Sequence, residues 1–425
     1  MKTQMTGMAV MAAACLVACS GDSPNWTGTV RDSAGVIIVE NSSEGLWNTG
    51  TAWTIAEELR IGTAAGDPDY QFGAITGIVV SSDETIYVLD QQASLIRAFD
   101  QSGTLQASFG TSGSGPGQLG AQVGPLLIAP GDTLYVPDMG NQRVSRFAPG
   151  GEYLDSYRIR FEEGIPFKWE NARSGAIVNQ VRRLAFGPDQ TADTMDLVAA
   201  RDHEGMVTDT LLRFRSGGTF SLGSDRPQLK FFAPEPMWTL AFGGGIWHGI
   251  NDDYRIGYYD HGTLVRIVTK PFEITPVGEA DQRALLTAMK NLMEASGAPP
   301  QAWARFEQII SFADDFPAYA QFLNGPGGSL WVQHLVIPST LSDEELEDFN
   351  PQLGLGASQW DIFDSEGRFL GSLELPARFQ PLRFYGNRMY GISRDELDVQ
   401  YVMRFRIDGL PGRDTGAVPI SGDPD

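Results

Sequence analysis

The 425-residue chain has little cysteine and a shortage of positive charge. Its only two cysteines, Cys15 and Cys19, lie within the first nineteen residues, so the rest of the chain cannot form an internal disulfide and must be stabilised by packing. It carries 31 Lys and Arg against 53 Asp and Glu, a formal net charge of −22. This charge repels a phosphate backbone, which excludes nucleic acid as an expected partner.

The chain begins with an apolar run that is too short to span a bilayer. The run follows the basic Lys2 and covers residues 8–18, whereas about 20 apolar residues are needed to cross the hydrocarbon core. A basic residue followed by a short apolar run is typical of an export signal that is removed from the mature protein. We therefore expect residues 1–18 to be a signal peptide.

The end of this run, Leu16-Val17-Ala18-Cys19, resembles the lipobox of bacterial lipoproteins. The resemblance implies that Cys19 is acylated and becomes the first residue of the mature chain, with residues 19–34 as a lipidated tether. Acyl chains would make the membrane a partner of the protein. Ser20 after the cysteine resembles the pattern that sorts lipoproteins to the outer membrane, so we expect an exported protein anchored in the cell envelope.

A short pattern recurs six times along the chain. An aromatic residue closes a strand-like run, two or three turn residues follow, and then comes glycine. The copies begin at Phe99, Phe147, Phe214, Tyr259, Phe363 and Phe405. Each copy predicts a turn between two strands, and another β-rich run precedes each one, which together indicate a four-stranded unit.

This repeat predicts an all-β fold, a six-bladed β-propeller over residues 35–409. The copies lie 42–48 residues apart where the loops are short, and a period of about 40 to 50 residues with an aromatic and glycine signature is typical of propeller blades. Residues 86–90, 95–100 and 115–119 together resemble one repeat of the NHL class of six-bladed propellers. The resemblance is closest over the first two blades.

The ends of the chain suggest how the ring closes. After Gly409 the sequence becomes a polar tail, residues 410–425, so the sixth blade lacks a fourth strand. Residues 53–62 precede the first blade and end like residues 105–110, the fourth strand of blade one. We expect this N-terminal strand to complete the last blade and to protect its edge. Residues 36–40 form a further strand whose partner the sequence does not identify.

Two insertions interrupt the repeat. Residues 276–316, between blades four and five, have apolar residues at helical spacing, broken at Gly297 and Pro299, which predicts a helical hairpin. Residues 335–357 separate the second and third strands of blade five and contain a capping box at Ser342. Both connections leave the ring at the same end, so both insertions should cover one mouth of the channel. They could hold a ligand, or the hairpin could simply bury its own apolar stripe.

Candidate binding residues lie within or at the ends of the predicted second strands of the blades, such as residues 196–201 of blade three, because these strands lead to this end. They are Asp90, Asp138, Arg201, His203, His248, His334, Arg394 and Asp395. Imidazoles and carboxylates that converge could hold a divalent metal, calcium or zinc, with His203, His248 and His334 as candidate ligands. The alternative is structural: Asp at a strand end commonly accepts hydrogen bonds from turn amides, and His248 among apolar neighbours suits a core position.

The sequence favours a binding role over catalysis. We expect a lipid-anchored envelope propeller that binds a ligand or protein, because no catalytic set or nucleophile motif is recognisable. The alternative is a metal-assisted lyase or hydrolase of the lactonase-like kind, since gluconolactonase-like propellers resemble this architecture. A structural scaffold is a third possibility. Trp238, Trp247, Trp331 and Trp360 could stack a sugar or peptide, or pack between blades.

Overall fold

The computed structural model describes residues 26–410, except 49, 173–174, 187–191, 223–226, 348 and 352–353. The predicted signal peptide (1–18), the lipidation site Cys19 and the part of the predicted tail from 411 to 425 lie outside the described residues. Within the described ranges, the structure contains no helix with the length and apolar character that a membrane span needs.

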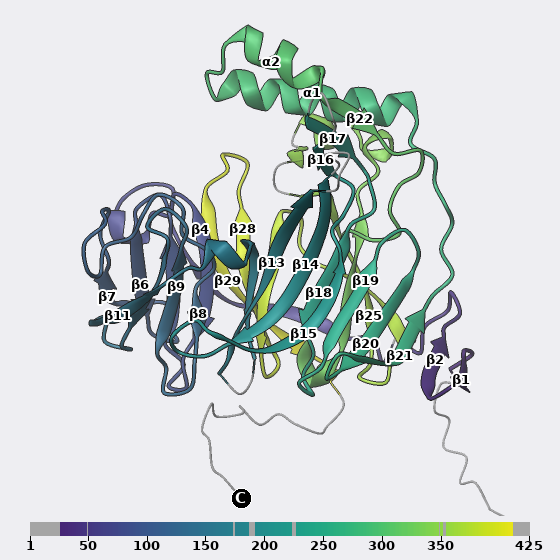
Figure 1. Cartoon of the computed structure of the whole chain (residues 1–425), viewed down its shortest axis with the longest axis horizontal. Helices are drawn as coiled ribbons and strands as arrows, with labels where there is room; N and C mark the ends of the chain where they lie inside the picture. The colour runs from purple at the N-terminus through teal and green to yellow at the C-terminus, as the bar shows by residue number, and fades with distance from the viewer. Residues whose placement is uncertain are drawn as a thin grey trace, which may run out of the picture.

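Six antiparallel sheets surround a common axis, which confirms the predicted six-bladed β-propeller (Figure 1). Blade one comprises β4 (Ile75–Val80), β5 (Ile86–Asp90), β6 (Leu95–Phe99) and β7 (Leu105–Phe109). Blade two comprises β8 (Leu127–Ile128), β9 (Leu134–Asp138), β10 (Arg143–Phe147) and β11 (Tyr153–Arg158). Blade three comprises β12 (Ile165–Asn171), β13 (Ile177–Phe186), β14 (Ala192–Arg201) and β15 (Val207–Arg215). The first strands of blades one to five contact one another in succession, and the first strand of blade six contacts that of blade one.

Blades four to six continue the ring. Blade four comprises β18 (Pro236–Leu240), β19 (Ile246–Ile250), β20 (Arg255–Asp260) and β21 (Thr263–Thr269). Blade five comprises β23 (Gln321–Asn324), β24 (Leu330–Leu335), β25 (Gly356–Phe363) and β26 (Phe369–Glu374). Blade six comprises β27 (Phe379–Tyr385), β28 (Arg388–Arg394), β29 (Gln400–Asp408) and the N-terminal β3 (Thr54–Ile61). The fourth strand of blade six, β3, pairs antiparallel with β29 from Ile61 opposite Val402 to Thr54 opposite Asp408.

The hydrophobic core lies between successive blades. Trp247 of blade four, for example, shares a cluster with Val332 and Phe363 of blade five. The four tryptophans singled out in the sequence are at most 2% exposed and belong to these clusters. Their flat rings therefore fill the wedge between twisted sheets rather than offering a stacking surface.

Blade three differs from the expectation. Residues 196–201 were expected in its second strand and Phe214 at the end of its third, but β14 is the third strand and Phe214 lies in the fourth, β15. The β13–β14 hairpin is long, with ten residues in each strand, and supplies a strand that the count missed. The prediction for this blade was wrong by one strand.

The described residues of 26–61 form an N-terminal belt along the outer edges of three blades. Strand β2 (Val36–Glu40) pairs in parallel with β21 of blade four, and β1 (Thr29–Ser33) pairs with β2. The backbone N–H groups of Leu46 and Trp47 then donate to Phe369 O and Leu370 O of blade five, before β3 enters blade six. The belt thus gives a partner to the strand at residues 36–40.

Three excursions from the ring meet at one end and form a cap, which comprises the described residues of 220–232, 276–316 and 336–355. It contains α1 (Glu279–Ala295), α2 (Pro300–Glu307), α3 (Asp343–Glu347) and a small sheet of β16 (Phe220–Leu222), β17 (Pro227–Phe231) and β22 (Ile310–Phe312). Phe232, Leu285, Met289 and Phe316 form its core. In Figure 1, α1 and α2 lie above the ring, beyond one end of the blades.

Candidate functional site

A buried carboxylate, Asp361, lies at the junction of blades four and five. It belongs to β25, where its neighbours Trp360 and Ile362 are buried in the core and its own side chain is fully buried as well. His334 Nε2 lies 2.9 Å from Asp361 Oδ1, and Lys270 Nζ lies 2.6 Å from Oδ2. Two cationic or potentially cationic groups thus meet one carboxylate.

Two hydroxyl groups complete the surroundings of Asp361. The hydroxyl of Tyr254 donates to Oδ2 at 2.8 Å, and Ser372 Oγ donates to Oδ1 at 2.7 Å. Burial alone would raise the pKa of Asp361, but His334 and Lys270 outweigh it and hold this pKa well below its usual range. Burial also raises the pKa of Tyr254 far above its ordinary value, so Tyr254 stays a neutral donor.

His334 is the member of this cluster that solvent can reach. Its side chain is 35% exposed, against 12% for Lys270 and 1% for Asp361. Its Nε2, the atom beside Asp361 Oδ1, is itself buried, so the exposed part of the side chain is the rest of the imidazole. The arrangement presents part of an imidazole at the surface, where it can contact a bound molecule.

Asp90 and Asp138 accept hydrogen bonds from turn amides, which is the structural alternative to ligand binding considered for them above. Asp90 accepts hydrogen bonds from the backbone N–H groups of Gly73, Ala74 and Ala93 at 3.0–3.2 Å, and from Arg97. Asp138 likewise accepts from the N–H of Gly120 at 2.8 Å. Both carboxylates are fully buried, so they bind turn amides and present no free oxygen to a ligand.

The three candidate metal-ligating histidines lie in three separate places. His248 packs between the rings of Phe214, at 4.6 Å, and Tyr259, and burial lowers its pKa to about 4. His203 is exposed beside Glu204. Among the residues that the structure describes, no group of three or more His, Cys, Asp and Glu could hold a metal ion.

Arg394 and Asp395 lie in and beside the loop between β28 and β29. Arg394 pairs with Asp398 at 3.0 Å, and Asp395 accepts from the N–H groups of Leu397 and Val399. Arg378, Arg394 and Leu397 line a shallow, open depression here, and the Leu397 side chain is 82% exposed. The loop offers a surface for contact but no enclosed site.

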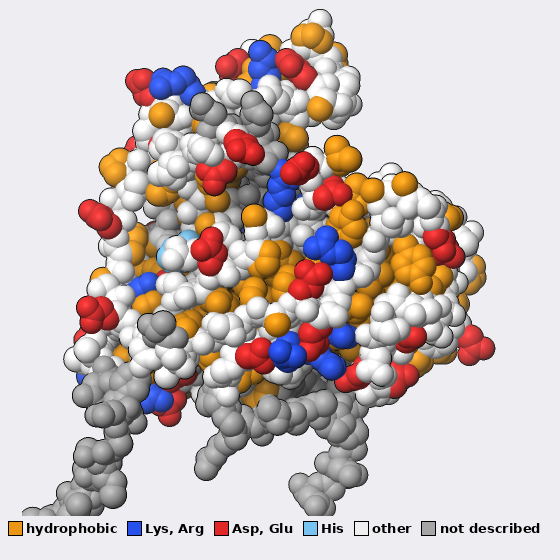
Figure 2. All heavy atoms as spheres, turned by 180° about the vertical axis from the view of Figure 1, so that it is seen from behind, with side chains coloured by type: hydrophobic (Ala, Val, Ile, Leu, Met, Phe, Trp, Pro, Cys, Tyr) orange, Lys and Arg blue, Asp and Glu red, His pale blue; other side chains and the backbone are white. Residues whose placement is uncertain are grey.

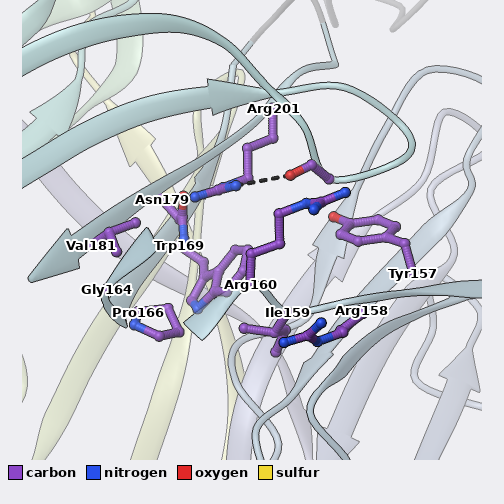
Figure 3. A pocket seen from close by; sticks show the side chains of 11 residues that line it. Tyr157, Arg158, Ile159, Arg160, Gly164, Pro166, Trp169, Asn179, Val181 and Arg201 are labelled. Atoms are coloured by element: carbon purple, nitrogen blue, oxygen red, sulfur yellow. Dashed lines mark hydrogen bonds between the residues drawn. The ribbon is translucent and has the colours of Figure 1, made fainter. Parts of the chain in front are cut away.

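Arg201 lies in a different position from the one expected. Because β14 is the third strand, Arg201 and His203 belong to the hairpin between the third and fourth strands, not to the end of a second strand. Arg201 lines a cavity between blades two and three (Figure 3). Its guanidinium donates to Asn179 Oδ1 at 2.7 Å and to Gly205 O at 2.8 Å, and its Nη2 pairs with Glu163 at 2.8 Å.

The Asp361 cluster was missed by the sequence reasoning, although His334 was identified. Lys270 and Tyr254 come from blade four, about 90 to 110 residues from Asp361 in the chain, so no local spacing links them. The available signal was an acidic residue inside an apolar strand, Trp360-Asp361-Ile362, because a buried carboxylate requires compensating partners.

Comparisons with known proteins show the fold. No family model and no curated protein matches the sequence. A solved structure from Bacteroides fragilis NCTC 9343, described as that of an exported protein, is 12% identical and covers 87% of this chain and 99% of its own, with a TM-score of 0.51. A member of the DUF4221 family from Bacteroides vulgatus ATCC 8482 is 11% identical and covers 84% of this chain and 99% of its own, also with a TM-score of 0.51.

Proposed function

We propose that this chain is an exported, lipid-anchored cell-envelope propeller of the NHL-like class, which binds a ligand or protein at its capped end. The observation that carries the proposal is the cap itself. Its three excursions leave the ring between blades three and four, between blades four and five, and within blade five. None of them adds a strand to a blade, yet they assemble into one structure.

The three excursions of the cap pack on one shared core and are not independent loops. Phe232, Leu285 and Phe316 bring all its parts onto one core together with Ile337 and Leu355. Asp281 at the start of α1 accepts a hydrogen bond from the N–H of Ser339 at 2.8 Å, which joins two excursions directly. Rigidly supported loops at one end of a scaffold are where binding sites concentrate.

The described surface near the cap is chemically mixed. In Figure 2, hydrophobic side chains gather on the ring beside the cap, and Asp and Glu side chains are scattered around them. At the junction of blades four and five, His334 adds an oriented polar group. Apolar contacts and a few fixed polar groups are the usual components of a recognition surface.

The proposed anchor would leave the capped end free. Strands β1 and β2 lie at the end of the molecule away from α1 and α2 (Figure 1). Seven peptide steps connect Cys19 to Trp26, which span at most about 25 Å. A lipid on Cys19 would therefore hold the belt close to the bilayer and point the cap away from it.

Two experiments test this proposal. Fractionation of the full chain and of a Cys19→Ser variant tests the anchor: we expect the parent in the detergent phase and the variant in the aqueous phase. Site-specific photo-crosslinking from the cap tests the binding role, and a cap that gives no adduct would contradict it.

A further inference from the structure

We propose that the ligand of the capped end carries an acidic group, a carboxylate or a phosphate, which binds to Arg383 inside the ring. This inference rests on the proposed binding role of that end and names the chemistry of its ligand. Arg383 lies in β27, the first strand of blade six, and its Nη2 donates to Leu126 O, directly before β8 of blade two, at 3.4 Å. Blade one lies between these two blades. The side chain therefore crosses the inner edge of blade one, and its guanidinium lies in the space that the first strands surround.

Arg383 is a cation without a counter-charge. Within the part of the chain that the structure describes, the bond to Leu126 is its one hydrogen bond, and no Asp or Glu forms an ion pair with it. Its side chain is partly buried, but the unpaired Nε and Nη1 atoms are not enclosed by protein. A dissolved acceptor can reach these donors, and hydrogen bonds between a guanidinium and an oxyanion are among the strongest in proteins.

Thr76 adds an unsatisfied hydroxyl beside Leu126. A β-bulge makes Thr76 the extra residue of β4, and β27 has a second bulge at residues 381–383. Bulges turn side chains out of the regular alternation of a strand. Thr76 Oγ1 is buried and has no hydrogen-bond partner, and a Cβ on the next residue, Gly77, would lie 2.2 Å from Leu126 N. Thr76 and Arg383 thus both reach the surroundings of Leu126, where an oxyanion would give each of them an acceptor.

The charges of the first strands favour an anion over a neutral acceptor. The first strands of the six blades contain three charged residues, Lys168, Glu170 and Arg383, in a chain whose net charge is −22. Lys168 Nζ lies 2.7 Å from Glu170 Oε1, so these two charges offset one another. The charge of Arg383 is left without compensation. A carboxylate or a phosphate balances it, whereas a neutral group does not.

The position of Arg383 connects it with the cap. Two of the cap excursions lead from the last strand of one blade to the first strand of the next, so the first strands begin at the capped end. Thr76 is the second residue of β4, and Leu126 directly precedes β8. Both residues therefore lie at the end of the first strands that faces the cap. A ligand that contacts the cap can place its acidic group on Arg383.

Anion-dependent thermal unfolding of the full chain tests the proposal. The parent, Arg383→Gln, Arg383→Lys, Thr76→Val and the control Arg283→Gln are titrated with sodium acetate and with methyl phosphate, at an ionic strength held constant with sodium chloride. Arg283 is an exposed arginine on α1, and its substitution changes the net charge by the same amount. We expect saturable stabilisation of the parent and the control by at least one anion. Binding should weaken about tenfold or more in Arg383→Gln, and less in Arg383→Lys and Thr76→Val.

The two anions distinguish the sources of the acidic group. Saturation by acetate alone assigns the site to carboxylates, saturation by methyl phosphate alone assigns it to phosphates, and saturation by both assigns it to either group. If neither anion stabilises the parent in a saturable way, or if Arg383→Gln responds as Arg283→Gln does, the proposal is wrong. Should Arg383→Gln fail to fold by circular dichroism, Arg383→Lys and Thr76→Val decide, and parental anion affinity in both would overturn the proposal.

Photo-crosslinking from the cap separates a failure of this inference from a failure of the proposed function. Cap adducts that form equally in the parent and in Arg383→Gln, without saturable anion binding, would refute the acidic group and leave the binding role intact. Saturable anion binding at Arg383 without any cap adduct would have the opposite meaning.

Discussion

His334 Nε2 lies 2.9 Å from Asp361 Oδ1, and the two residues come from adjacent strands of blade five. The second oxygen of the same carboxylate contacts Lys270, which follows the last strand of blade four. One buried carboxylate therefore joins two blades and also orients a partly exposed imidazole. This double role makes Asp361 the polar centre of the junction.

Replacing Asp361 by Asn should be strongly destabilising. The substitution leaves Lys270 mostly buried without a counter-charge, and breaking a buried ion pair from one side costs about 3–5 kcal/mol. Urea denaturation measures the free energy of unfolding. Glu374→Gln, on the neighbouring strand β26 and exposed, should stay within about 0.5 kcal/mol of the parent. An equal loss in both variants would show that the buried pairing is not the cause.

The same carboxylate should make stability depend on acid. The pKa of Asp361 is lower in the folded chain than its ordinary value of 3.8, so its contribution is fully present above that value and is lost as the pH falls below it. Between about pH 5 and pH 2.5 the parent should lose more unfolding free energy than Asp361→Asn. Parallel curves for the two proteins would contradict this.

His248 should give a second, separate pH dependence. Burial lowers its pKa from 6.5 to about 4, so the unfolded chain takes up the proton first. Stability is therefore complete above about pH 6.5 and falls as the pH drops toward 4, by up to about 3 kcal/mol. Chemical denaturation at pH 7 and pH 4.5 should show this loss in the parent. His248→Phe, which keeps the contact with Phe214, should flatten it.

Asn41 should hold the N-terminal belt on the ring. Its Nδ2 donates to Thr269 O and Gly367 O, both at 3.0 Å, and its Oδ1 accepts from the N–H of Phe369 at 2.7 Å. Thr269 O keeps its hydrogen bond from the Asn41 backbone N–H, but Asn41→Ala removes the side-chain partner of Gly367 O and of the Phe369 N–H, so we expect a loss of about 2–4 kcal/mol in thermal or chemical unfolding. The exposed Asn48 offers the matched substitution Asn48→Ala, with an expected change below about 1 kcal/mol. A small effect at Asn41 would mean that the belt is held elsewhere.

Asp281 should control the integrity of the cap. It is buried and accepts from the N–H of Gly278 at 3.0 Å as well as from Ser339. Asp281→Ala removes both bonds, and we expect faster hydrogen exchange in residues 276–316 and 335–357 while the blades stay protected. Glu279→Ala, exposed in the same helical turn, is the control. Uniform exchange changes over the whole ring would contradict a local role.

The sequence predicted the ring because each blade carries its own local signal. An aromatic residue such as Phe99 or Phe147 closes the third strand where the next turn begins, and this signal needs no distant partner. In blade three this signal led to a wrong strand assignment, because the β13–β14 hairpin extends the blade and places Phe214 one strand later. The aromatic and glycine signature is still present there, but Phe214 follows Phe147 by 67 residues, more than the 42–48 found where the loops are short.

Long-range relationships could not be predicted in the same way. The parallel pairing of β2 with β21 joins residues that are about 230 positions apart, and nothing in residues 36–40 specifies that partner. The residue types at the capped end suggested a metal site, but whether histidines converge depends on the strand and depth of each one. His248 and His334 lie in second strands, whereas His203 lies in a later hairpin.

The central claim, that the capped end is the binding surface, can be tested by photo-crosslinking in envelope vesicles. A photoreactive phenylalanine analogue is placed at Gln301 or Glu344, exposed in the cap, and at Asp32, exposed in β1. The adducts are resolved by gel and by intact mass. We predict a discrete adduct from the two cap positions and none from Asp32. No adduct from the cap, or the same adducts from all three positions, would contradict the proposed role.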